Sequence, residues 1–315
     1  MNIPVATPET LRQVIDLHGV AGVTVLDDDE CDELFDELLT FVENATSAWD
    51  TPFSRSNKAT WKQYFNLAPL HGYLIQCFGI GNSPAVWLVR QNPKIVALFA
   101  TFYDVKPSDL LTSFDGASLL LPPEDTGRGF YKGKDWYHCD QSFTERGFQC
   151  VQSWVTAKEV RSGDATLTYL KDSHMFHDAF ALEFKVSKKT DWFKLTPEHM
   201  AWYEAKGCVK VDVVCPKGTV VFWDSRTIHC GKGAIKGRET PDYRAIVYAY
   251  FMPRSAASDK DLKRKREAFD CQRTTTHLAK TAKLFATKPR FFKADNITMP
   301  PRPAMSLLGA KLAGF

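Results

Sequence analysis

The stretch WYHCDQ, residues 136–141, places a histidine and an aspartate two positions apart in a segment with strand-like composition. Residues i and i+2 of a strand point to the same face, so His138 and Asp140 can enter one interior while Cys139 points away. Another histidine, His229, directly follows a second strand-like segment. Two imidazoles and one carboxylate that leave coordination positions open suit Fe(II). We therefore expect these three side chains to form a metal site.

A single arginine, Arg244, begins the next strand-like segment after the second histidine. A guanidinium can bind a carboxylate through two parallel hydrogen bonds. The distal carboxylate of 2-oxoglutarate requires such a partner, while its other end would occupy two open positions on the metal. Arg238, which lies earlier in the same loop, is the alternative candidate.

Four further residues are candidates for contacts inside the site. Gln152 and Trp154 share one face of a predicted strand, where Gln152 could donate to 2-oxoglutarate or be a satisfied buried amide, and Trp154 could meet the substrate. Thr168, on the next strand, is a similar candidate for the cosubstrate. Arg226 could meet an anionic substrate or pair with a nearby aspartate, Asp224 or Asp172. His174 and His177 follow a strand rather than lie on one, so they are not expected to bind the metal. His277, in the C-terminal region, could line the mouth of the site, although a structural role is favoured.

Composition limits the possible partners. The 315 residues carry 40 basic and 37 acidic side chains, a net charge of +3, which argues against nucleic acid as the main partner. The basic run at 260–266 contains acids and is expected to be a solvated helix face, with binding of nucleic acid or of an acidic partner as the alternative. The eight cysteines include no C-x-x-C pair, so neither a zinc ribbon nor a disulfide scaffold is expected.

Targeting signals are not visible in the sequence. The start lacks a basic region followed by an apolar core, and the apolar run at 95–103 is too short to span a bilayer. The final residues, Leu-Ala-Gly-Phe, are not a peroxisomal signal. These patterns predict a cytoplasmic protein with reduced thiols and no membrane partner.

The order of sequence patterns predicts an α+β fold with a mostly β core, in one domain over 1–315. Residues 1–111 are expected to be helical, 112–255 to form a double-stranded β-helix (a cupin-like jelly roll), and 256–315 to form a basic helical extension. The predicted strands are 117–121, 136–139, 148–157, 165–170, 210–214, 219–223, 228–230 and 244–252. The predicted helices are 28–44, 93–102 after an Asn92 cap, one after Thr196 and one from Ser258 or Asp259. The proline-rich tail from 298 is expected to run over the surface.

Four segments together resemble the phytanoyl-CoA dioxygenase family of Fe(II)/2-oxoglutarate oxygenases. They are WYHCDQS, QSWVTAKEVRSGDATLTYLKDSH, KGTVVFWDSRTIHCG and YRAIVYAYFMP. The resemblance covers roughly 112–255, and extends to about 285 in a less characterised branch of the family. The family's Pro-Gly-Ser-His turn is Lys-Asp-Ser-His at 171–174 here, and the insert 232–243 lengthens the gap between the distal histidine and the arginine.

The resemblance implies a jelly-roll core, one Fe(II), and 2-oxoglutarate and O2 as cosubstrates, with succinate and CO2 as by-products. Because related halogenases carry a small residue at the position of Asp140, the carboxylate favours hydroxylation. The substrate is expected to be a small molecule. A protein or peptide hydroxylase and a non-catalytic metal-binding jelly roll are the alternatives.

Overall fold

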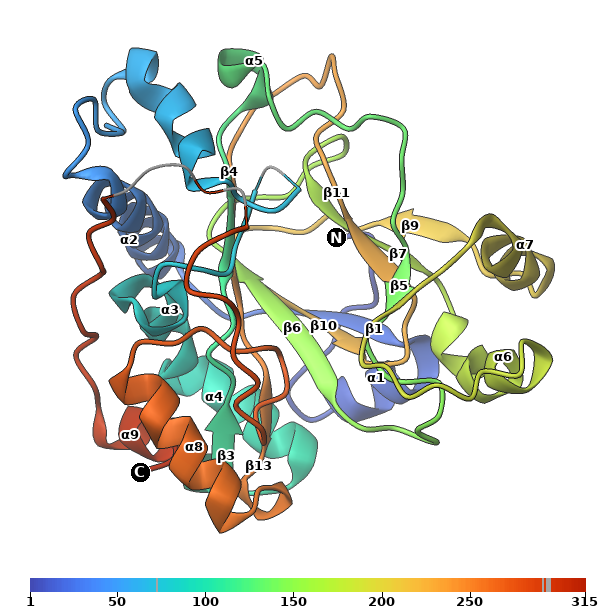
Figure 1. Cartoon of the computed structure of the whole chain (residues 1–315). Helices are drawn as coiled ribbons and strands as arrows, with labels where there is room; N and C mark the ends of the chain where they lie inside the picture. The colour runs from blue at the N-terminus through green and yellow to red at the C-terminus, as the bar shows by residue number, and fades with distance from the viewer. Residues whose placement is uncertain (72, 291, 293–295) are drawn as a thin grey trace.

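The computed structural model describes residues 1–71, 73–290, 292 and 296–315. Within them the chain forms two larger antiparallel sheets with helices on both sides (Figure 1). The first sheet has the strand order β1-β10-β6-β12-β4-β2. Its strands are β1 (Val20–Thr24), β10 (Thr219–Asp224), β6 (Val151–Thr156), β12 (Arg244–Tyr248), β4 (Ala117–Leu120) and β2 (Leu74–Ile75).

The second sheet has the strand order β8-β5-β11-β7-β9, and its paired strands are also antiparallel. Its strands are β8 (Phe193–Lys194), β5 (His138–Cys139), β11 (His229–Lys232), β7 (Thr166–Leu170) and β9 (Lys210–Asp212). Trp154 and Ile246 of the first sheet share a buried cluster with Leu167 and Tyr169 of the second. The two sheets therefore face each other across a common core.

Helices cover the outer sides of both sheets. The main cluster packs the first sheet against α1 (Leu11–His18), α2 (Asp28–Thr46), α3 (Pro84–Arg90) and α4 (Pro93–Tyr103). A smaller cluster packs the second sheet against α6 (His177–Glu183) and α7 (Pro197–Ala205). The helices α8 (Asp259–Asp270) and α9 (Leu307–Ala313) contact each other near the C-terminus (Figure 1). The short helix is α5 (Pro123–Thr126), and the 3-10 turns are η1 (Lys58–Leu67), η2 (Ile80–Asn82), η3 (Pro107–Asp109), η4 (Ser173–Phe176) and η5 (Arg254–Ala256).

The predicted helices are present with their expected caps. The Asn92 side chain accepts a hydrogen bond from the Lys94 amide at 2.9 Å, so α4 begins as predicted. Thr196 forms a capping box at α7, and Ser258 rather than Asp259 caps α8. A side-chain oxygen at the cap satisfies one of the free amides of the first turn, which explains why these starts were recognisable.

The N-terminal part differs from its prediction, because it is not purely helical. Val20–Thr24 forms β1, an edge strand of the first sheet that pairs with β10, and Leu74–Ile75 forms β2 at the opposite edge. Val20, Ala21 and Val23 are buried. A five-residue strand between two helices carries a weaker periodic signal than the helices do, and its pairing partner lies about two hundred residues away.

The C-terminal part also differs in two places. The predicted strand 244–252 divides into β12 and β13 (Phe251–Pro253), and β13 leaves the first sheet to pair with β3 (Leu110–Thr112). The tail does not simply run over the surface, because α9 begins at a Ser306 cap and buries Leu312. The burial of apolar side chains such as Leu312 favours this helix even though the segment before it is rich in proline.

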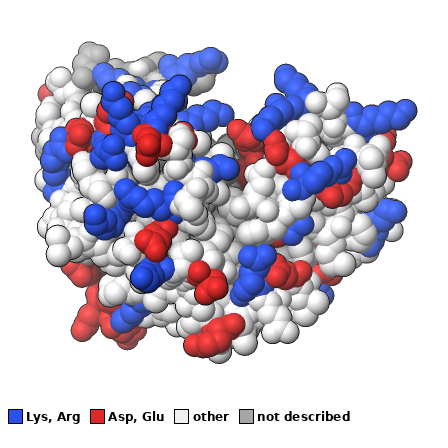
Figure 2. Space-filling model, turned by 90° about the horizontal axis from the view of Figure 1, so that it is seen from below, with Lys and Arg blue, Asp and Glu red and all other residues white. Residues whose placement is uncertain are grey.

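Charged side chains of both signs intermingle on the face in Figure 2, as the near-balanced composition leads us to expect. Within the described ranges, no helix combines the length and apolar character needed to cross a bilayer.

Candidate metal centre and its cavity

Strand pairing brings the two distant histidines together. His229, the first residue of β11, is the direct cross-strand partner of His138 on β5. Directly opposed residues of an antiparallel pair point to the same face, and here the ring centroids are 4.4 Å apart. Cys139 and Cys230, the next residues along the two strands, are buried in the cluster on the other side of the sheet. The alternation of strand side chains thus separates the histidines from their cysteine neighbours.

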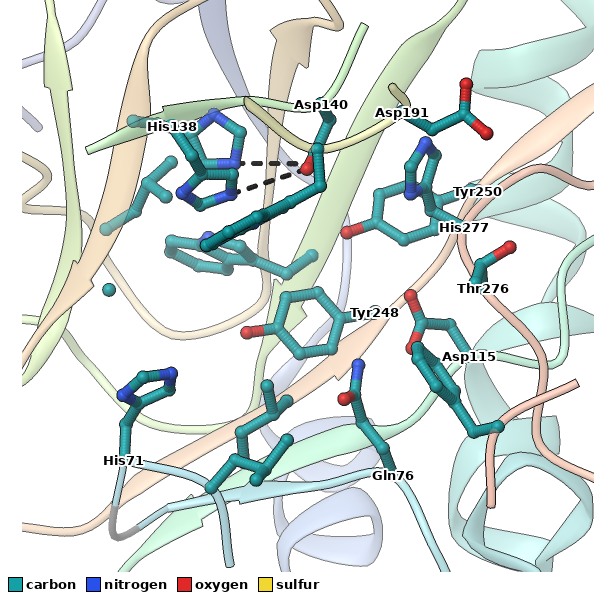
Figure 3. A pocket seen from close by; sticks show the side chains of 18 of the residues that line it. His71, Gln76, Asp115, His138, Asp140, Asp191, Tyr248, Tyr250, Thr276 and His277 are labelled. Atoms are coloured by element: carbon teal, nitrogen blue, oxygen red, sulfur yellow. Dashed lines mark ion pairs between the residues drawn. The ribbon is translucent and has the colours of Figure 1, made fainter. Parts of the chain in front are cut away.

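Asp140 follows the last residue of β5 and completes a three-residue cluster (Figure 3). One carboxylate oxygen lies 3.4 Å from His138 Nε2, and the other lies 3.6 Å from His229 Nε2. One ligand atom from each residue falls within 4.8 Å of the others. A single cation about 2.1 Å from each ligand atom can therefore be held by all three.

The histidine rings are turned so that Nε2 faces the carboxylate. The Nδ1–H of His229 donates to the Thr227 carbonyl oxygen at 2.9 Å, and His138 Nδ1 lies 3.4 Å from the Trp136 carbonyl oxygen. A carbonyl oxygen can only accept, so this hydrogen bond places the proton of His229 on Nδ1 and leaves the Nε2 lone pair for a metal.

The protonation states also favour metal binding. Burial and the neighbouring His138 lower the pKa of His229 to about 4, so this imidazole is neutral near pH 7. Burial alone would raise the pKa of Asp140, but His138 and the other nearby imidazoles outweigh it and hold that pKa well below its usual range. A neutral imidazole and an ionised carboxylate are the forms that bind a cation.

Gln152 lies on β6 beside this carboxylate. Its amide Nε2 donates to Asp140 at 2.8 Å, while its amide oxygen has no hydrogen-bond partner among the described residues. The sequence-based expectation was a contact with 2-oxoglutarate or a satisfied buried amide. The structure places the donor on Asp140, where it fixes the orientation of the carboxylate.

Arg244, the first residue of β12, lines the same cavity and is 5% exposed. Its guanidinium donates to Ser118 Oγ at 3.1 Å and to the Ala165 carbonyl oxygen at 3.0 Å, and it lies over the rings of Tyr73 and Trp154. Among the described residues, no carboxylate lies within 4.0 Å of it. The guanidinium can therefore accept an external carboxylate as its counter-ion.

Arg238, the alternative, is already paired. Its guanidinium contacts Glu124 at 2.8 Å and Asp164 at 2.6 Å, and it does not line the cavity. Two carboxylates neutralise this cation and hold it in the loop between β11 and β12.

The remaining candidates differ in whether their side chains line the cavity. Trp154 lines the cavity, and no described residue accepts a hydrogen bond from its indole N–H. Thr168 instead faces away, because Leu167 is the β7 residue that reaches the cavity, and the Thr168 hydroxyl lies 2.8 Å from that of Tyr137. Arg226 pairs with buried Asp224 at 2.6 Å and is not among the cavity-lining residues. Of these three candidates, only Trp154 is placed for contact with a substrate.

The two histidines after β7 lie away from the cluster. His174 Nε2 lies 3.3 Å from the Asp16 carbonyl oxygen, and His177 stacks on Phe143 with ring centroids 4.6 Å apart. His277, by contrast, lines the cavity from the C-terminal segment, with its ring edge-on to Tyr250.

The cavity has a volume of about 480 Å³ and contains all three residues of the metal cluster in its wall. Several lining residues were not among the candidates from sequence: His71, Tyr73, Gln76, Asp115, Trp136, Asp191, Trp192, Trp223, Tyr248 and Tyr250. One signal was available, since Tyr248 and Tyr250 lie an even number of positions after Arg244 on a predicted strand. Gln76 and Asp115 lie outside regular elements and offered no such signal.

Comparisons with known proteins give one sequence relative and a similar fold. No family model matches the chain, so the resemblance to the phytanoyl-CoA dioxygenase family stays an expectation. The Ava biosynthesis cluster protein O of Aspergillus versicolor is 30% identical over 209 residues, which are 64% of this chain and 65% of that protein. The match therefore spans less than two thirds of the relative's length.

Among solved structures, protein JW0805 of Escherichia coli has a TM-score of 0.59 at 10% identity, with 99% of this chain and 84% of that chain covered. The epimerase SnoN, crystallised with Fe3+, alpha ketoglutarate and nogalamycin RO, has a TM-score of 0.47 at 20% identity, with 78% and 83% covered. At 10% identity, the likeness to JW0805 concerns the fold alone.

Proposed function

We propose that the protein is an Fe(II)- and 2-oxoglutarate-dependent oxygenase that hydroxylates a small molecule. One observation carries the proposal: the His138–Asp140–His229 cluster shares a cavity with Arg244, a buried guanidinium that has no carboxylate partner among the described residues. Two imidazoles and one carboxylate leave coordination positions open for a cosubstrate. A protein that only stored a metal would not need a buried guanidinium placed to bind a carboxylate.

The residues present fit both groups. His138, Asp140 and His229 would hold the iron, and Arg244 would bind the distal carboxylate of 2-oxoglutarate. When bound, iron with 2-oxoglutarate and O2 supplies C–H oxidation: R–H, O2 and 2-oxoglutarate give R–OH, succinate and CO2. Gln152 keeps the Asp140 carboxylate in place.

Aromatic side chains beside the two histidines, which we call the aromatic wall, protect this chemistry from water. Trp136 stacks on His138 with centroids 4.9 Å apart, and Trp223 lies 5.3 Å from His229. Apolar walls beside a metal exclude solvent from the reacting groups.

Two observations support a small-molecule substrate over a protein. A cavity of about 480 Å³ falls within the range typical of small-ligand sites. The name of the sequence relative assigns it to a biosynthesis cluster. The facing antiparallel sheets are the arrangement expected of a double-stranded β-helix, and we include that fold, in one oxygenase domain, in the proposal.

The test is iron-dependent conversion of 2-oxoglutarate to succinate by the purified protein, alone and with small-molecule and peptide libraries. We expect turnover that requires Fe(II) and rises with a small-molecule substrate. Asp140→Ala should abolish it, because one of three ligands is lost. The matched control is Asp135→Asn, which alters a carboxylate that precedes β5 and lies outside the cavity. Full activity of Asp140→Ala would overturn the proposed centre.

A further inference from the structure

Asp115 is a buried acid on the cavity wall that the proposed chemistry does not use. It lies between β3 and β4, is 6% exposed and lines the cavity (Figure 3). One carboxylate oxygen accepts a hydrogen bond from the Gly116 amide at 2.6 Å. Among the described residues, no cationic side chain lies within 4.0 Å of the carboxylate. An isolated buried carboxylate is costly, so its retention in a ligand cavity calls for a partner.

Neither His277 nor Arg90 forms an ion pair with the Asp115 carboxylate, although the charges of both lower its pKa. The buried guanidinium of Arg90 donates instead to the main-chain carbonyl oxygens of Gly81 and Asp115. Gln76, which lies next to Asp115 in Figure 3, is a neutral donor that stabilises the charge without cancelling it. Burial outweighs these neighbours and raises the pKa of Asp115.

The surroundings of the carboxylate suit a ligand that combines a positive charge with an apolar remainder. Tyr248 and Tyr250 line the cavity near Asp115, with parallel rings whose centroids are 6.2 Å apart. Burial, and then the proximity of Asp115, raise the pKa of Tyr250. The faces of such rings attract positive charge, and their area packs against apolar groups. His277 and Thr276 close this side of the cavity, and within the described part of the chain the Thr276 hydroxyl has no hydrogen-bond partner.

We propose that Asp115 binds a positively charged nitrogen of the substrate, so that the substrate is a small amine or amidine-type cation on a flat apolar body. This proposal rests on the proposed function, since it assigns a substrate class to the same cavity. Asp115 would anchor one end of the molecule while another part lies at the His138–Asp140–His229 cluster, and the aromatic wall would hold the body between them. Anchoring at one end limits which C–H bond can reach the metal.

The test uses two probes of the same shape and different charge. The full chain is loaded with Zn2+, which occupies the centre without redox chemistry. Binding of 2-phenylethylamine, a cation at neutral pH, and of 2-phenylethanol, which is neutral, is followed by quenching of tryptophan fluorescence, because Trp154, Trp192 and Trp223 line the cavity. We expect the amine to bind about tenfold more tightly, as a hydrogen bond to a charged group predicts.

Asp115→Asn should weaken amine binding about tenfold and leave phenylethanol binding within about twofold, because the amide keeps the shape but removes the charge. The matched control is Asp191→Asn. Asp191 lies on the rim of the same cavity, with its side chain 45% exposed and 3.9 Å from Lys283. Solvent screens its charge, so the preference for the amine should persist in this variant.

Three results would overturn the assignment: no amine binding by the wild type, equal binding of the two probes, or an unchanged preference in Asp115→Asn. A lower melting temperature of Asp115→Asn with an unchanged preference would make Asp115 a counter-ion for buried Arg90. Zn2+ affinity, measured on the same samples, reports on the metal centre separately. Failure of the metal site and failure of amine recognition are thereby distinguished.

Discussion

The Gln152 amide shows how one residue outside the metal cluster can set its geometry. Its donor reaches the Asp140 carboxylate at 2.8 Å from the opposite sheet. The imidazoles of His138 and His229, which also lie beside the carboxylate, are themselves needed by the metal. Partners such as the Gln152 amide influence metal affinity although they do not touch the metal.

We expect Gln152→Ala to weaken metal binding about 10- to 100-fold while leaving the fold intact. The measurement is competition for Zn2+ with a chromophoric chelator. Thr168→Val is the control, since the Thr168 hydroxyl pairs with Tyr137 and not with the cluster. Equal affinity of Gln152→Ala and the wild type would show that Asp140 needs no such support.

The depressed pKa of His229 predicts how the stability of the metal-free protein depends on pH. The unfolded imidazole takes up a proton near pH 6.5, but burial and His138 delay uptake in the folded state to about pH 4. Between these values the unfolded state binds more protons, so stability falls as the pH drops from 6.5 toward 4 and is fully present above 6.5.

Urea unfolding of the metal-free wild type and of His229→Gln, compared at neutral and mildly acidic pH, isolates this contribution. The advantage of the wild type should shrink on acidification, because Gln does not titrate. A constant difference between the two proteins across this range would contradict the assigned pKa.

Strand alternation explains which site residues were predictable from sequence. The His138–Asp140 pair needs only local periodicity, and Arg244 is recognisable as a lone cation at the start of an apolar strand. Thr168 was misjudged because alternation gives two faces and does not say which one looks inward; the register of β7 against β11 decides that. Asp115 lies in an irregular segment, where neither the two-residue period of a strand nor the 3.6-residue period of a helix applies.

At the level of elements, helix starts were easier to predict than strand ends. Caps are local hydrogen bonds and leave a mark in the sequence, whereas a strand ends where its partner ends. β5 is thus only two residues long although the apolar segment around it is longer. The division of 244–252 into β12 and β13 likewise depends on β3, which lies more than a hundred residues earlier.

The helix α4 is one of the helices that pack against the first sheet from outside. Phe99 is fully buried. Its ring centroid lies 5.2 Å from that of Phe222 in β10 and 4.4 Å from that of Phe251 in β13. We expect Phe99→Ala to lower the free energy of unfolding by about 3–5 kcal/mol, because it removes a large side chain from a filled core.

Urea unfolding measures this loss, and Leu182→Ala provides the control, since Leu182 is 69% exposed. Zn2+ affinity should survive in Phe99→Ala, because α4 does not contribute to the cavity wall. A loss below about 1 kcal/mol would mean that α4 is not a stability-determining layer.

At the scale of the whole molecule, the cavity draws its wall from distant parts of the chain. The wall includes residues of both sheets, of the segment 190–192 and of the C-terminal part between 276 and 285, together with Leu70, His71, Tyr73, Leu74 and Gln76. The sequence predicts the two-sheet core and the metal cluster, because both follow from patterns within strands. The wall depends on how loops close over the core, and that requires the three-dimensional arrangement.

The central claim is that one cavity holds a metal at His138, Asp140 and His229 and a carboxylate at Arg244. Calorimetric titration of 2-oxoglutarate into the anaerobic, Fe(II)-loaded protein tests it most directly. Arg244→Met should weaken binding about 10- to 100-fold, since charge-assisted hydrogen bonds are lost. Arg238→Met should change it less than about threefold, because that guanidinium is already paired with Glu124 and Asp164. Failure of the loaded wild type to bind 2-oxoglutarate, or weakening by Arg238→Met alone, would contradict the account.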